Sequence, residues 1–296
     1  AVLGAGKLLD LDEGQLADAV ALNLCQATCS GEAANSAGSA VRTVREGFAA
    51  QAAVQSALLA GRGVPARFET PFEGKLGYYH MYARDNYTPE KVLEGLGTVF
   101  QGQFISFKPW PSCRATHTSI DGVLPLMREH HIKPGEIQSI HITLQEIGRM
   151  VTEPRDVKYR PRSAAIAKFS LPFVVGTAAV CGQVGLDSFE TERLSDPAVL
   201  AMGDKVTCAI RPGWTKEQNK YTDLTIRTVR GEFSLHLEHP LGCVEHPMGE
   251  EALRRKFLDC AARAKKPICP ERVEQLYGTI LHLEELEDMN GLFDLL

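Results

Sequence analysis

The chain has 296 residues, of which 44% are hydrophobic and 23% charged, and its formal net charge is −5. This composition is typical of a soluble globular protein with room for two hydrophobic cores. The mild acidity argues against a nucleic-acid partner, because proteins that bind nucleic acids normally have a basic face. No apolar run is long enough to predict a membrane span.

The first 105 residues are expected to form helices. Asp12 can cap a helix whose apolar residues recur at helical spacing. A second helix is predicted over residues 45–60, where alanine and serine residues would let a neighbouring helix approach closely. Thr88 followed by Pro89 is a cap followed by proline at the first helical position, which predicts a third helix.

Residues 108–117, Lys-Pro-Trp-Pro-Ser-Cys-Arg-Ala-Thr-His, are the most informative stretch of the chain. Two prolines hold an extended loop that carries a lysine, and the loop runs into a helix predicted over about 115–130. Cations at a helix N-terminus suit the binding of a carboxylate, because the backbone N–H groups there favour anions. The alternative interpretation is a proline-rich connector between two domains.

Helices and strands are mixed between residues 106 and 240. Alternating apolar and polar residues predict a strand at 140–144, and another strand is predicted over 206–210. Residues 224–229 and 232–237 are typical of a hairpin with a short turn. With predicted helices at 115–130 and 163–180, this region is expected to be a compact α+β domain.

Helical spacing returns after residue 249. The simplest arrangement returns residues 241–296 to the helical domain of residues 1–105. The predicted fold class is therefore α+β, with an all-helical domain, discontinuous in sequence, and an inserted smaller lid domain over residues 106–240.

The eight cysteines are scattered and form no C-x-x-C pair. The histidines close to Glu238 and Glu245 also match no standard metal-ligand spacing; they are His236, His239 and His246. We therefore expect no metal ion and no other cofactor. Scattered thiols suit a reducing compartment, and a cytoplasmic location is expected, with no signal peptide visible.

Four blocks of the sequence resemble the MmgE/PrpD family: residues 7–12, 45–63, 108–121 and 167–173. Members of this family include 2-methylcitrate dehydratase, cis-aconitate decarboxylase and iminodisuccinate epimerase. The resemblance implies a helical domain with a smaller lid, a homodimer, and a metal-independent active site in the cleft between the domains. The implied substrates are small di- or tricarboxylic acids.

The resemblance implies a lyase similar to 2-methylcitrate dehydratase, which removes a proton next to a carboxylate of its substrate. An epimerase of the same family is the alternative. The family's N-terminal portion, with acidic and histidine residues of the active site, is expected to lie upstream of Ala1 and to be missing here. That expectation leaves a third possibility, a truncated relative that dimerises without catalysing a reaction.

Three residues of the proline-rich loop are the catalytic candidates: Lys108, Cys113 and His117. Lys108 matches the family's loop lysine; it would stabilise the developing dianion, and burial would lower its pKa towards the range of proton transfer. Cys113 matches a position that is histidine in decarboxylase-like members, and it could be a reactive thiol or pack against Trp110. His117 matches the histidine that closes the motif, and it could equally have a structural role.

The substrate-binding candidates are Arg45, Arg114, Arg162 and Phe173. Arg114 belongs to the loop, and Arg45 falls where dehydratase-like members tend to have a different basic residue. Arg162 and Ser163 could form an anion site together or simply cap a helix. Phe173 stands where relatives more often have tyrosine, so a hydroxyl donor is absent.

Overall fold

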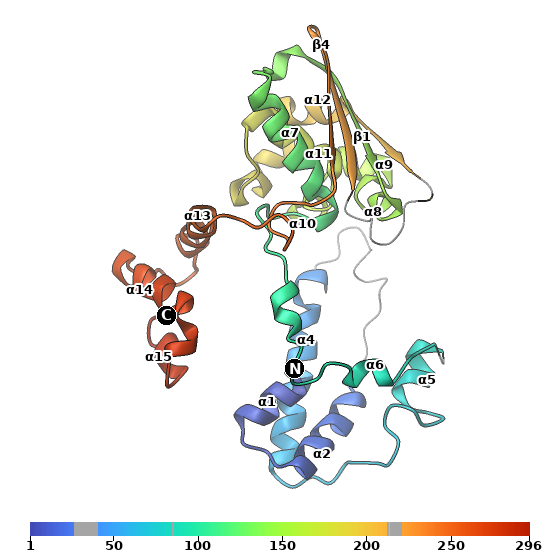
Figure 1. The fold of residues 1–296 in the computed structure, drawn as a ribbon, viewed down its shortest axis with the longest axis vertical. Coiled ribbons are helices and arrows are strands. Elements are labelled where there is room, and N and C mark those ends of the chain that lie inside the picture. Colours follow the sequence, from blue (N-terminus) through green and yellow to red (C-terminus); the bar gives the residue numbers. More distant parts are fainter. Residues whose placement is uncertain (27–40, 85, 212, 214–220) are drawn as a thin grey trace. The chain divides into compact units, whose positions relative to one another are not determined.

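The computed structural model describes residues 1–26, 41–84, 86–211, 213 and 221–296, without the side chains of residues 42 and 43 (Figure 1). Contacts divide the chain into two compact units, Ala1–Phe100 and Gln101–Leu296. Among the described helices, none combines the length and the apolar character that crossing a membrane requires.

The first unit is helical. Its helices are α1 (Val2–Leu8), α2 (Glu13–Leu24), α4 (Val41–Gly61), α5 (Tyr78–Ala83) and α6 (Glu90–Leu93). The predicted Asp12 cap is confirmed: the Asp12 carboxylate accepts a hydrogen bond from the Gln15 backbone N–H at 2.8 Å, and the Gln15 side chain accepts one from the Asp12 N–H at 3.0 Å. The α4 alanines Ala53, Ala57 and Ala60 are buried, and these small side chains allow α1 and α2 to pack closely on α4.

The helix predicted after Thr88 and Pro89 is a single turn, α6. It ends because Gly95 and Gly97 follow with φ angles of +71° and +80°. Left-handed backbone of this kind suits glycine and cannot continue a right-handed helix.

The second unit contains a four-stranded mixed sheet in the order β2-β1-β3-β4. The strands are β1 (Ile137–Leu144), β2 (Val206–Ile210), β3 (Thr222–Thr228) and β4 (Gly231–Leu237). β1 pairs parallel with β2 and antiparallel with β3, and β3 and β4 form the predicted hairpin. All four predicted strands are thus confirmed.

The helices of the second unit are α7 (His117–Glu129), α8 (Arg149–Thr152), α9 (Arg155–Tyr159), α10 (Ala164–Ala167), α11 (Leu171–Cys181), α12 (Pro197–Asp204), α13 (Glu250–Ala261), α14 (Pro270–Leu281) and α15 (Asn290–Phe293). Short 3-10 helices occur at Gln101–Phe104, Arg114–Thr116, Pro134–Glu136, Glu146–Gly148, Leu186–Phe189, Arg193–Ser195 and Leu283–Glu285. The single helix predicted over 163–180 is two helices, because the Ser170 hydroxyl accepts a hydrogen bond from the Phe173 N–H at 3.1 Å and starts α11 afresh.

The main hydrophobic core of the second unit lies between the sheet and helices α7 and α11, which pack on each other and against the strands. Its fully buried members include Ile120, Val123, Ile140, Ile142, Val174, Val175 and Ile226. His141, between two buried isoleucines of β1, is exposed, as expected for a sheet with one covered face. The α+β class is confirmed; the return of residues 241–296 to the helical domain and the inserted lid stay predictions.

Candidate active site

Hydrogen bonds at the start of α7 fix the proline-rich loop. The Thr116 hydroxyl donates to the Cys113 carbonyl at 2.8 Å, so the buried Ser112 hydroxyl is the donor in its own 2.8 Å bond to Thr116. The Cys113 N–H donates to the carbonyl of Lys168 at 2.8 Å. The loop is therefore held both to α7 and to the end of α10.

Lys108 is exposed, and its ammonium group turns back onto the loop, where Nζ donates to the Ser112 carbonyl at 3.2 Å. The second unit therefore does not bury Lys108 as the sequence analysis expected, because the chain before it, residues 101–107, is itself exposed. Among the described residues, no carboxylate lies within ion-pair distance of Lys108.

Arg114 joins three segments of the second unit. Its Nη1 donates to the carbonyls of Phe107 at 3.2 Å and Leu241 at 3.0 Å, and it lies 3.2 Å from Nδ1 of His117. Within the described part of the chain, no acidic side chain forms an ion pair with Arg114. Arginine stays charged in proteins, so this loop carries a second cation besides Lys108; the buried Asp121 carboxylate acts on Arg114 through its charge without forming an ion pair with it.

His117 is fully buried. Burial and then the positive charge of Arg114 lower its pKa from 6.5 to about 3. The ring is therefore neutral at neutral pH; we assign the proton to Nε2, which lies 3.4 Å from the Ser112 carbonyl, because Nδ1 faces the Arg114 donor. With both nitrogens engaged, the structural alternative is the better supported role, and a direct catalytic role stays a prediction.

Asp121 is a residue of the site to which the sequence analysis gave no role. It is buried on α7, and its carboxylate accepts from Nε1 of Trp110 at 2.6 Å and from the N–H of Leu241 at 2.8 Å. Burial raises the pKa of Asp121, against these two hydrogen bonds. Its position four residues after His117, on the same face of α7, is the signal that could have identified it.

Replacing Asp121 with alanine is expected to lower the free energy of unfolding by about 2–4 kcal/mol, because two part-buried donors lose their acceptor. Chemical denaturation of the full chain measures the effect. Asp156→Ala, at an exposed position of α9, is the matched control, for which we expect a change of at most about 0.5 kcal/mol. Similar small losses in both variants would contradict the proposed role of Asp121.

Cys113 is half-buried and packs against the edge of the hydrophobic core. Lys158, on α9, lies close enough for its charge to interact with Cys113. Burial lowers the pKa of Lys158, and Cys113 acts in the opposite direction. No motif marks Lys158 in the sequence, so only the fold identifies it as a possible proton carrier.

The remaining candidates belong to other segments of the chain. Phe173 is 2% exposed and packs in the core, with its ring 6.0 Å from that of Phe189; its contact with substrate stays a prediction. Arg162 is exposed, and Ser163 accepts from Ile166 N–H at 3.3 Å as a plain cap of α10. Arg45 lies in the first unit, paired with a neighbouring glutamate at 2.7 Å, and its substrate role stays a prediction.

A pocket of about 180 Å³ opens next to Arg114. Its walls come from the start of α7, from the segment that follows β1, and from Tyr221 and Pro240. Arg114 is the cationic side chain among the lining residues. A small apolar pocket with one cation suits a small organic anion.

The loop of residues 238–246 faces the start of α7. The Gly242 carbonyl accepts from the Phe107 N–H at 2.8 Å, and the Gly242 N–H donates to the His246 carbonyl at 2.7 Å. Gly242 has a φ of +88°, and a Cβ added there would lie 2.3 Å from the Phe107 carbonyl oxygen. Only glycine fits this position without moving the backbone.

Gly242→Ala is accordingly expected to destabilise the protein by about 2–4 kcal/mol, through the unfavourable φ together with the clash. Gly182→Ala is the control, because Gly182 has a similar φ of +70° but open space around it; there we expect about 1 kcal/mol. Both variants have the unfavourable φ, but only Gly242→Ala has the clash, so the difference between their unfolding temperatures measures the effect of the clash. Equal losses would show that the contact with the Phe107 carbonyl oxygen is unimportant.

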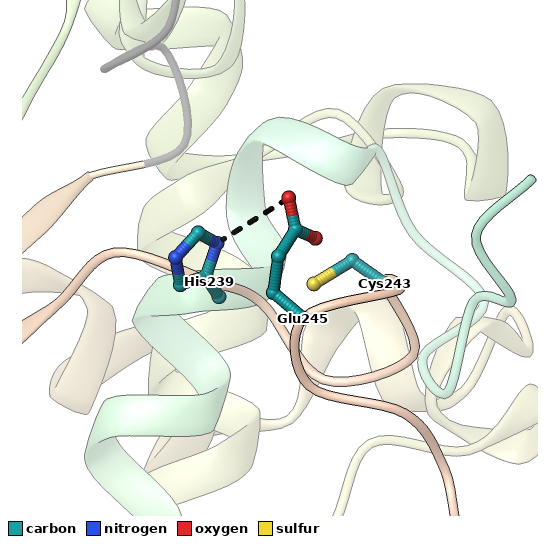
Figure 2. Close-up of side chains that lie close together, drawn as sticks. All are labelled: His239, Cys243 and Glu245. Carbon is teal, nitrogen blue, oxygen red and sulfur yellow. Dashed lines mark ion pairs between the residues drawn. The ribbon is translucent and has the colours of Figure 1, made fainter. Parts of the chain in front are cut away.

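His239, Cys243 and Glu245 of this loop bring their ligand atoms within 4.8 Å of one another (Figure 2). No metal site was expected here, because the spacing of the histidines near Glu238 and Glu245 matches no standard ligand pattern; Cys243 was not among the residues considered. The thiol completes a set of donors that can hold a metal ion.

Comparison with known families identifies the chain. The model described as MmgE/PrpD C-terminal domain matches residues 110–275, and the model described as MmgE/PrpD N-terminal domain matches residues 1–90. The chain belongs to the MmgE/PrpD family, which confirms the resemblance seen in its motifs. One expectation is corrected: residues 1–90 do contain sequence of the family's N-terminal domain.

A curated relative is the cis-aconitate decarboxylase of Mus musculus, which is 27% identical to this chain over 300 residues. The alignment covers 99% of this chain and 59% of the relative. The chain therefore spans only about three fifths (59%) of the length of that enzyme.

Proposed function

We propose that the protein is a lyase that removes a proton next to a carboxylate of a small di- or tricarboxylic acid, in a dehydration similar to that of 2-methylcitrate dehydratase. The observation that carries the proposal is the pair of cations on one loop: Arg114 lines a pocket, and neither Arg114 nor Lys108 forms an ion pair with a carboxylate among the described residues. Family membership and the name of the relative support the lyase class.

The two cations suit the chemistry of this reaction. Removing a proton beside a carboxylate builds up a second negative charge, and fixed positive charges stabilise that state more than the ground state. Arg114 can bind a carboxylate through parallel hydrogen bonds, whereas Lys108 supplies a point charge. Both would hold substrate carboxylates at the loop.

Proton transfer is assigned to the Cys113 side of the loop. Cys113 lies between the two cations in sequence and next to the half-buried Lys158. Burial lowers the pKa of Lys158, which makes its ammonium a better proton donor than an exposed lysine. His117 acts through Arg114, which it helps to orient.

Two residues support the proposed subtype of lyase. Cys113 stands where decarboxylase-like members have histidine, and Phe173 stands where many relatives have tyrosine. Both differences favour dehydration over decarboxylation. An epimerase stays the alternative. Epimerisation requires only the removal and return of a proton at the same carbon, and the Cys113 thiol could carry that proton.

Proton NMR in D₂O of the full chain with 2-methylcitrate, citrate, cis-aconitate and iminodisuccinate tests the proposal. A new olefinic signal without release of CO₂ is the expected result. Exchange of a C–H proton without elimination would establish the epimerase, and CO₂ release would establish a decarboxylase. No change with any of these acids would favour the non-catalytic relative.

We also propose that the protein forms a homodimer. Light scattering of the full chain would measure its mass in solution and so test this proposal.

A further inference from the structure

The cluster of His239, Cys243 and Glu245 differs from an ordinary surface group of polar side chains. Cys243 is 4% exposed, and Nδ1 of His239 is buried without a hydrogen-bond partner among the described residues. This nitrogen lies 3.9 Å from Oε1 of Glu245, too far for a hydrogen bond (Figure 2). A buried polar atom without a partner points to a missing ligand.

We propose that these three side chains form a Zn²⁺ site. Thiolate sulfur, imidazole nitrogen and carboxylate oxygen are the donors that zinc takes in proteins, at about 2.0–2.3 Å. Tetrahedral geometry at those bond lengths places ligand atoms roughly 3.4–3.8 Å apart. The three atoms, all within 4.8 Å of one another, therefore need to approach one another by at most about 1.4 Å.

The charges and the outer contacts of the cluster also suit zinc. One thiolate and one carboxylate balance the two positive charges of the ion, because histidine binds metals as the neutral ring. With Nδ1 on the metal, Nε2 of His239 would face Oε2 of Glu238, which lies 3.9 Å away. A carboxylate behind a metal-bound histidine is a common second contact that fixes the ring.

The backbone holds the cluster in place before any metal binds. Gly242 lies between two of the ligands, and its N–H and carbonyl are both hydrogen-bonded. The Leu241 N–H donates to Asp121, and the Leu241 carbonyl accepts from Arg114. A fixed backbone reduces the ordering cost of binding, and a metal at this position would hold the two ends of the 238–246 loop together.

The zinc is proposed as a structural ion. Three protein ligands leave a fourth position for water, unlike the closed set of four ligands usual in structural zinc sites; the structural role rests on the position of the ion within one loop, and the proposed lyase reaction does not involve it. The site stands on the geometry of the 238–246 loop alone, so it remains testable whether or not the protein is a lyase.

The experiment uses the full chain, freed of metal with a chelator and titrated with Zn²⁺ against a chromophoric competitor. We expect one ion per chain, a higher unfolding temperature with Zn²⁺ but not with Mg²⁺, and a sulfur-to-metal charge-transfer band when Co²⁺ replaces Zn²⁺. Cys243→Ser should abolish that band, and Cys243→Ser and Glu245→Gln should each weaken Zn²⁺ binding by about tenfold or more.

Cys260→Ser is the matched control, because Cys260 is an exposed thiol on α13. It should keep wild-type affinity and the Co²⁺ band. Glu245 is partly exposed, so Glu245→Gln provides a ligand variant that folds even if the buried Cys243→Ser does not. Unchanged zinc affinity in Glu245→Gln, an equal loss in Cys260→Ser, or no saturable binding to the wild type would each overturn the site.

Discussion

Lys108→Met is expected to lower kcat/KM by about 10²–10³-fold on the acid that the NMR assay identifies, because one preorganised charge that stabilises the reacting anion is lost. The ammonium of Lys108 is held by a backbone carbonyl and has no acidic partner among the described residues, so its removal should leave the fold intact. Steady-state kinetics with the full chain measure the effect, and thermal unfolding verifies the fold.

Two further variants make this result specific. Lys108→Arg keeps the positive charge and should recover part of the lost activity. Lys266→Met removes an exposed lysine between α13 and α14 and should leave kcat/KM unchanged. If Lys108→Met were as active as Lys266→Met, the loop lysine would have no role in the reaction.

His117 is expected to make the protein less stable in acid. Its pKa is 6.5 when exposed and about 3 in the folded chain, so below pH 6.5 the unfolded state takes up a proton that the folded state excludes. The stabilisation is complete above pH 6.5 and is lost as the pH falls towards 3. Between pH 7 and about pH 4.5 the loss from this one residue is about 2.5 kcal/mol.

Urea denaturation at the two pH values measures this loss in the wild type and in His117→Asn. The variant is destabilised at pH 7, because it loses buried hydrogen bonds, but its loss between pH 7 and pH 4.5 should be smaller than that of the wild type by about 2.5 kcal/mol. Val123→Ala, a substitution in the core on the same helix, should keep the wild-type difference between the pH values. Equal pH dependence of His117→Asn and the wild type would contradict a neutral, buried His117.

The elements that were predicted well have strong local signals. Alternating residues of β1 and the β3–β4 hairpin identified their strands, because one face of the sheet is buried and the other exposed. The missed boundaries depend on single residues: Ser170 restarts a helix that apolar spacing alone would continue, and Gly95 ends α6 early. The spacing of apolar residues does not show where a single residue ends a helix or starts a new one.

The site was predictable only where it is local. Lys108, Cys113, Arg114 and His117 are close in sequence, so the motif itself brought them together. Arg114 donates to the Leu241 carbonyl and Asp121 accepts from the Leu241 N–H, across at least 120 residues, and no local pattern predicts a contact at that separation. The same folding of distant segments places the 238–246 loop beside α7, and with it Cys243.

Titration calorimetry with tricarballylate, a tricarboxylic acid that carries no leaving group, tests most directly whether the proline-rich loop binds carboxylates. The wild-type full chain should bind it saturably, with affinity that falls as salt is added, and Lys108→Met should bind it about tenfold or more weakly, which corresponds to about 1.4 kcal/mol. The same affinity in both proteins would contradict a carboxylate site at Lys108 and Arg114.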